Sequence, residues 1–113
     1  MKPSFAQRVD NGFNKLTRAQ RDRIDLNELD MEHMYKCAIG QAFVGIGYEA
    51  ALYRLALKIN VVRTLDNRRD VSSWAVENGF DLYPSEIEHF KTLTEEWHKR
   101  LLTERIADGL ACC

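Results

Sequence analysis

Apolar side chains recur at helical spacing along most of this chain, and this period constrains the fold more than any other feature of the sequence. It is clearest between Pro84 and Gly109, where large apolar residues fall every three or four positions on one predicted helix face: Ile87, Phe90, Leu93, Trp97, Leu101 and Ile106. Thr92 and Glu95, at the spacing of a capping box, predict a break between a short helix and a long one. The C-terminal part is therefore predicted to be helical.

A second stripe predicts a helix over residues 5–21. Its apolar face consists of Phe5, Val9, Phe13 and Leu16, and Ser4 is placed to cap its start. Gly12 inside this helix costs about 1 kcal/mol relative to alanine. The helix therefore either depends on tertiary packing or breaks at Gly12.

The middle of the chain predicts helices separated by polar or glycine-rich connections. Residues 24–30 predict an extended linker that places three apolar side chains in the core: Ile24, Leu26 and Leu29. Asp30 then caps a predicted helix over residues 31–40, and further helices are predicted over residues 50–57 and 71–78. Gly79 is typical of a helix C-terminus.

These elements predict a mainly α fold, a compact single-domain bundle of about five helices. Residues 58–70 are ambiguous, because Ile59, Val61 and Val62 favour a short extended or β segment near 59–63 before a polar loop. A chain of 113 residues is large enough for one core and too small for two lobes. We expect residues 1–110 to form the domain and residues 111–113 a flexible tail.

One stretch, residues 43–66, has the spacing of a dinucleotide-binding motif. Gly45 and Gly47 open a G-x-G-x-x-A pattern, and Asp66 follows at the distance of the acid that binds a ribose in such folds. That motif requires a strand before the glycines and a parallel sheet around them, whereas helical patterns flank this stretch. We interpret the glycines as a tight reversal between two packed helices; the alternative is a ligand or nucleotide bound at the turn.

Charged residues are segregated along the chain, although the net charge is only −1. Residues 1–23 are mostly basic, residues 24–33 hold four acids and no Lys or Arg, and residues 77–96 are mostly acidic. Blocks of this kind can pair with one another on the surface of a compact domain, and we adopt that interpretation.

The alternative is a basic face that binds nucleic acid. It would consist of the N-terminal helix or of the loop that holds Arg63, Arg68 and Arg69. No aromatic residues interleave with these bases, and the isoelectric point near 6.3 is below that of dedicated nucleic-acid domains. Nucleic-acid binding therefore ranks below protein binding.

The sequence indicates no catalytic or metal-binding group. Its three histidines are scattered, so a closed zinc site is not expected. Glu86 and His89 have the E-x-x-H spacing of di-iron bundles, but the second pair that such a site needs is not identifiable. Cys37 is predicted to be a small buried side chain, and Cys112 and Cys113 to be free thiols. We expect no cofactor, no metal and no enzymatic activity.

Several short blocks share a spacing that is found elsewhere: IDL at 24–26, LDM at 29–31, CAIGQAF at 37–43, GF at 79–80, and LT at 93–94 followed by Trp97. Together they resemble a group of small proteins of unknown function from actinobacteria and their bacteriophages. The likeness does not extend to the stretch between Gly47 and Gly79. Because that group has no known activity, the resemblance implies an origin and no catalytic residues.

The resemblance further implies that Cys37, Gln41, Phe80 and Trp97 determine the fold. Gln41 would be a buried amide that satisfies backbone groups near the glycine turn, with Trp97 packed over it. The alternative is that Gln41, Tyr48 and Trp97 line a small ligand pocket. Aromatic residues at helical spacing are usually packing residues, so we favour the core interpretation.

The expected function is that of a small non-enzymatic accessory protein, encoded by a phage or mobile element, that binds a host or phage protein. The N-terminus lacks the apolar core of a signal peptide and no stretch has the length of a membrane span, so we expect the protein in the cytoplasm and away from membranes. The sequence is compatible with a homo-oligomer. Contact residues are expected at the glycine turn or the basic loop: Gly45, Gly47, Tyr48, Arg63, Arg68 and Arg69.

Overall fold

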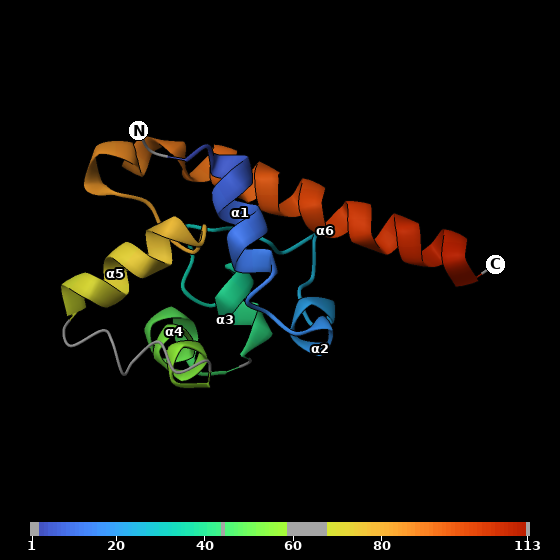
Figure 1. The fold of residues 1–113 in the computed structure, drawn as a ribbon, viewed down its shortest axis with the longest axis horizontal. Coiled ribbons are helices and arrows are strands. Elements are labelled where there is room, and N and C mark those ends of the chain that lie inside the picture. The colour runs from blue at the N-terminus through green and yellow to red at the C-terminus, as the bar shows by residue number, and fades with distance from the viewer. Residues whose placement is uncertain (1–2, 44, 59–67, 113) are drawn as a thin grey trace.

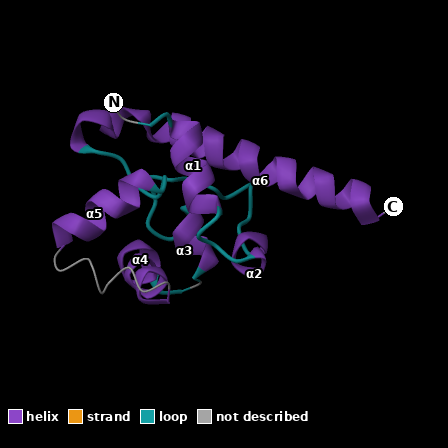
Figure 2. Ribbon diagram, viewed as in Figure 1, coloured by secondary structure: helices purple, strands orange, loops and turns teal. Residues whose placement is uncertain are grey.

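Helices make up the regular structure of the described part of the chain, which comprises residues 3–43, 45–58 and 68–112 of a computed structural model (Figure 1). The elements in chain order are α1 (Phe5–Phe13), α2 (Arg18–Asp22), α3 (Ala38–Ala42), α4 (Gly47–Lys58), α5 (Arg68–Glu77), the 3-10 helix η2 (Pro84–His89) and α6 (Phe90–Cys112). Figure 2 shows no strand among these residues. The prediction of a mainly α bundle is confirmed; the segment predicted near 59–63 lies outside the described residues.

The longest helix, α6, forms one side of the molecule, and α1 packs across it (Figure 1). The shorter α3 packs against α4 and α2, and α1 also contacts α5. The C-terminal part of α6 extends past the other helices, consistent with overall dimensions of 47 × 29 × 26 Å. The helix continues through Cys112, so residues 111 and 112, expected in a tail, lie in α6.

The core is organised around Trp97 of α6, which is fully buried. Its indole N–H donates a hydrogen bond of 2.7 Å to the backbone oxygen of Gly79, and its ring stacks on Phe80 with centroids 5.8 Å apart. Helix α1 approaches the same turn so closely that a Cβ at Gly12 would lie 1.9 Å from the backbone oxygen of Asn78. Only glycine fits at this position. The close approach therefore explains why residue 12 is glycine, although glycine is unfavourable inside a helix.

The helix predicted over residues 5–21 is two helices. Ser4 caps α1 as predicted, since its hydroxyl accepts a hydrogen bond from Gln7 N. The chain leaves α1 after Phe13 and starts α2 with a capping box, in which Thr17 and Gln20 exchange side-chain to backbone hydrogen bonds. The break therefore lies beyond Gly12, at residues 14–17.

The prediction of a helix over residues 31–40 is wrong. Most of this stretch forms turns, because polar side chains bond to the backbone two residues on: Asp30 accepts from Glu32 N, and the His33 ring accepts from Tyr35 N. The helix begins only after Cys37, whose sulfur accepts a hydrogen bond from Gly40 N. The linker before it does bury Ile24 and Leu29, as predicted.

The last helical stretch breaks after His89, before Phe90, rather than at Thr92. Leu93, Trp97 and Leu101 are fully buried, but the two ends of the predicted apolar face are not: Ile87 is 66% exposed and Ile106 is 55% exposed. Ile87 lies in η2, where the 3-10 turn changes the direction of its side chain. Ile106 lies in the C-terminal part of α6.

The two middle helices are both longer at their N-termini than predicted. Helix α4 starts at Gly47 instead of Ala50, and α5 starts at Arg68 instead of Val71. Gly79 follows α5 with φ +69°, a left-handed conformation typical of a helix C-terminus.

Candidate functional site

The glycine turn connects α3 to α4 and reverses the chain, as the sequence predicts. Gly45 and Gly47 both have positive φ, +89° and +78°. The features of a phosphate cradle are lacking: helix α3 stands where a strand is required, and Glu49 places negative charge in the first turn of α4. Asp66 lies outside the described residues.

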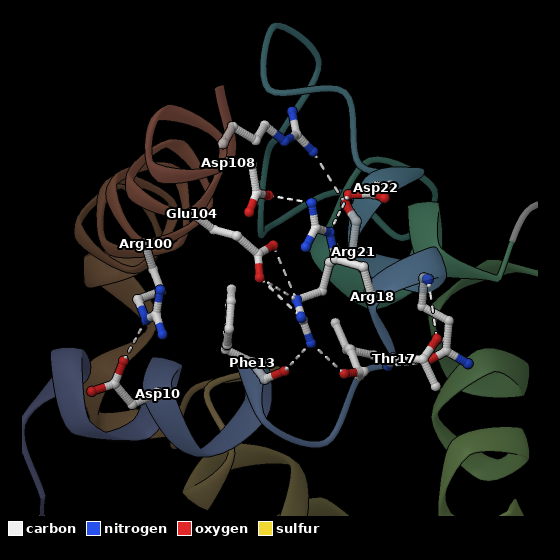
Figure 3. Close-up of polar contacts among 12 residues, drawn as sticks. Asp10, Phe13, Thr17, Arg18, Arg21, Asp22, Arg100, Glu104 and Asp108 are labelled. Atoms are coloured by element: carbon white, nitrogen blue, oxygen red, sulfur yellow. Dashed lines mark hydrogen bonds and ion pairs between the residues drawn. The ribbon is translucent and has the colours of Figure 1, made fainter. Parts of the chain in front are cut away.

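The two arginines of α2 that Figure 3 labels are engaged within the molecule. Arg21 of α2 binds Glu104 of α6 at 2.9 Å and donates a 2.6 Å hydrogen bond to the backbone oxygen of Leu16. Arg18 of α2 also pairs with α6, through Asp108. A third pair has its base on α6 instead, because Arg100 of α6 binds Asp10 of α1 at 3.0 Å. Figure 3 shows all three pairs. These three pairs thus join residues that are far apart in the sequence, but Glu104 and Asp108 lie outside the acidic stretch 77–96.

A further arginine of this block is entirely buried. Arg8 of α1 is 2% exposed and forms two hydrogen bonds of 3.0 Å to the carboxylate of Glu86 in η2. The predicted E-x-x-H pair is therefore divided, because Glu86 faces Arg8 while His89 lies 3.5 Å from Glu88. For the basic loop, Arg63 lies outside the described residues, and Arg68 and Arg69 form the first turn of α5.

A cavity of about 200 Å³ opens beside the start of α4. Four parts of the chain form its walls: the turns at 31–37, helix α4, the connection after α5 and the start of α6. The residues that line it include Met31, Cys37, Tyr48, Phe80, Asp81 and Phe90. The Tyr48 hydroxyl donates a 3.0 Å hydrogen bond to Asp81 Oδ2, while Asp81 Oδ1 accepts from Leu82 N at 2.8 Å. The cavity thus has apolar and aromatic walls and one fixed carboxylate.

Burial raises the pKa of two groups in these walls. The Tyr48 hydroxyl has a raised pKa mainly because it is desolvated, with the negative charge of Asp81 acting in the same direction. Burial likewise raises the pKa of the Cys37 thiol, from 9.0 to about 11. Both groups are therefore neutral at physiological pH, and Cys37 lacks the thiolate character of a nucleophile.

Next to this cavity, an apolar surface surrounds the glycine turn. We name it the Met34 face and define it by Met34, Tyr35, Ile46, Tyr48 and Tyr53, which line a hollow of about 490 Å³. Met34 is 58% exposed and Tyr35 is 53% exposed. Tyr48 lines both this hollow and the smaller cavity, so the two adjoin.

The residues predicted to determine the fold do not act as one group. Cys37, Phe80 and Trp97 are buried, whereas Gln41 is only half-buried. The Gln41 amide bonds to the backbone of Asp25 and Lys36, which ties the extended linker to α3 instead of serving the glycine turn. Trp97 packs on Phe80, and neither Trp97 nor Gln41 lines the cavity beside Tyr48.

Sequence reasoning missed the carboxylate of Asp81 and the exposed pair Met34 and Tyr35. Asp81 follows the glycine-phenylalanine pair at 79–80, yet nothing local in the sequence indicates its bond to Tyr48, 33 residues earlier. His33 and Cys37, four positions apart, both line the cavity, a spacing that sequence reasoning overlooked. Among residues 3–43, 45–58 and 68–112, no group of three or more His, Cys, Asp or Glu is arranged to hold a metal ion.

The chain matches no protein-family model, no curated protein and no solved structure that was compared with it. None of the helices that the structure describes combines the length and apolar composition that a bilayer crossing requires.

Proposed function

We propose that this chain is a non-enzymatic accessory protein, of phage or mobile-element origin, that acts in the cytoplasm by binding another protein through the Met34 face. The observation that carries the proposal is the exposure of Met34 and Tyr35 beside an apolar hollow of about 490 Å³. Contiguous exposed apolar surface on a soluble domain is typical of an interaction site, and methionine and tyrosine are both enriched at such interfaces.

Two features of the surrounding structure support this proposal over nucleic-acid binding. The arginines of α1 and α2 are bound by carboxylates of η2 and α6: Arg8 by Glu86, Arg18 by Asp108 and Arg21 by Glu104. The Met34 face also borders acidic residues, Glu32 and Asp81, which would repel a phosphate backbone.

Affinity purification with matched variants tests the proposal. Purified chain would be incubated with actinobacterial lysate, the source that the sequence resemblance indicates, and compared with Met34→Glu and Leu102→Glu. Leu102 is an exposed apolar residue of α6, 40% accessible, and does not belong to the Met34 face. We expect the wild type and Leu102→Glu to retain the same discrete protein and Met34→Glu to lose it. Retention of no protein, or equal retention by all three, would contradict the proposal.

A further inference from the structure

We infer that the cavity beside Tyr48 and Asp81 receives the side chain of a lysine or arginine from the protein partner. This inference rests on the proposed function, because it names the chemistry of the partner that the Met34 face binds. It is carried by the size of the cavity, the charge of its lining and the nature of its walls.

The size of the cavity suits one long side chain. Its volume of about 200 Å³ is below the range of about 300 Å³ upward that holds a drug-sized ligand. It adjoins the hollow of the Met34 face through Tyr48. A partner segment lying on that face could therefore place a single residue in the cavity.

The charge of the lining selects a cation. Asp81 and Glu32 both line the cavity, and neither lysine nor arginine does so among the residues that the structure describes. His33 also lines the cavity, and its Nδ1 accepts a hydrogen bond from Tyr35 N.

Asp81 is held in a fixed position for such a contact. Each of its oxygens accepts one hydrogen bond, from Tyr48 and from Leu82 N, whereas a carboxylate offers about four acceptor sites. An ammonium or guanidinium group can use the remaining sites in charge-assisted hydrogen bonds, which are stronger than neutral ones.

The walls of the cavity suit the rest of a basic side chain. Phe80, Phe90 and Met31 provide apolar surface for its methylene groups, and the aromatic rings favour a nearby cation. A second hollow shares Glu32 and Phe90 with the cavity and is lined by Asp30, Glu88 and Lys91 among others. Because the cavity adjoins the Met34 face through Tyr48, we expect the partner segment to have an apolar residue next to its basic one.

Titration of the labelled full chain, followed by amide NMR shifts, tests the inference. The probes are n-butylammonium and n-butylguanidinium, with 1-pentanol as an uncharged control of similar shape. We expect both cations, and not pentanol, to shift the signals of Tyr48, Phe80 and Asp81. No shifts at these residues, or equal shifts with pentanol, would overturn the inference.

Charge variants locate the site. Asp81→Asn is expected to weaken butylammonium binding by about tenfold or more, and Glu32→Gln, at an exposed position, to weaken it by a smaller factor. Glu95→Gln, an exposed residue of α6 that does not line the cavity, changes the net charge equally and should leave binding unchanged. Melting curves would establish that Asp81→Asn is folded. Equal weakening in all three variants would overturn the inference.

Capped tripeptides distinguish a protein partner from a free amine. Leu-Lys-Leu should bind at least about tenfold more tightly than butylammonium, because its leucines also contact the Met34 face. Leu-norleucine-Leu keeps the leucines but lacks the charge, so it should bind more weakly than Leu-Lys-Leu. Equal affinity of peptide and amine would show a site for free amines and overturn the assignment to a protein partner.

If the cations fail to bind while Met34→Glu still abolishes partner retention, this inference fails and the proposed function stands.

Discussion

Gly12 and Gly109 both lie in helices but differ in their surroundings, which gives a matched pair of substitutions. A Cβ at Gly12 would overlap the backbone oxygen of Asn78, whereas a Cβ at Gly109 would meet nothing within 4 Å. We expect Gly12→Ala to lower the free energy of unfolding by about 2 kcal/mol or more and Gly109→Ala to raise it by up to about 1 kcal/mol. Urea denaturation measures both; equal effects would contradict the close approach of α1 to the Asn78 turn.

Arg8 and Glu86 form a buried ion pair whose members depend on each other. Removal of one partner leaves the other charged and desolvated, so Glu86→Ala is expected to destabilise the protein by about 3 kcal/mol. Replacing both, as Arg8→Met with Glu86→Leu, should destabilise it less, because no charge then remains buried. The exposed Glu95→Ala serves as control and should change stability by less than about 0.5 kcal/mol. A double variant less stable than Glu86→Ala would contradict this account.

Ionisation of the Cys37 thiol is expected to make the free energy of unfolding depend on pH in the alkaline range. Its pKa is about 11 in the folded protein against an ordinary 9.0, so the neutral thiol favours the folded state. The contribution is fully present below pH 9 and is lost as the pH rises toward 11. Cys37→Ser, which does not titrate there, should show a smaller fall in unfolding free energy between pH 8 and pH 10.5. Parallel curves for the two proteins would contradict a buried thiol.

At the scale of elements, two threonines with the same sequence signal have different roles. Thr17 and Gln20 form a capping box at the start of α2, whereas Thr92, at the same spacing from Glu95, lies inside α6 and starts no helix. Thr17→Ala should therefore destabilise the protein by about 1 kcal/mol. Thr92→Ala should be neutral or slightly stabilising, since alanine has the higher helix propensity. Thermal denaturation distinguishes these outcomes, and equal losses would place a helix start at Thr92.

The difference between these threonines shows what the sequence can and cannot predict about the elements. Helical period correctly indicates α1, α4, α5 and α6, because each buries apolar residues of one face, such as Val9 and Phe13 in α1 and Leu93, Trp97 and Leu101 in α6. It fails over residues 31–37, where Asp30 and His33 bond locally to the backbone and turns replace the helix. Ile106 continues the apolar period of α6, yet its side chain is exposed, and the spacing of the apolar residues does not indicate this.

The same limit applies to the candidate site. The glycine turn is predictable, because two glycines between two helical patterns indicate a reversal. The cavity is not, because it combines side chains separated in sequence, such as Tyr48 and Asp81. Met34 and Tyr35 were assigned to a helix by their spacing, and only the turns at 31–37 place them on the surface.

At the scale of the whole molecule, ion pairs of both senses join α1 and α2 to α6: Arg18 and Arg21 of α2 bind acids of α6 (Figure 3). Between α1 and α6 the sense is reversed, because Arg100 of α6 binds Asp10 of α1. The alternation of charge predicts ion pairs within the molecule but not their partners: Arg21 binds Glu104, which lies 83 residues later and outside the acidic stretch 77–96. These contacts engage Arg18 and Arg21 internally, whereas Met34 and Tyr35 of the Met34 face are exposed. Protein binding through this face is the central claim.

Site-specific photocrosslinking in cells tests that claim most directly. A benzoylphenylalanine residue would be placed at Tyr35 on the Met34 face and, as a control, at Leu102 on α6, both of which are exposed. We predict that Tyr35 yields one discrete crosslinked species containing a second, different protein, and that Leu102 does not. No crosslink from Tyr35, the same species from both positions, or a species that contains only two copies of this chain would contradict the claim.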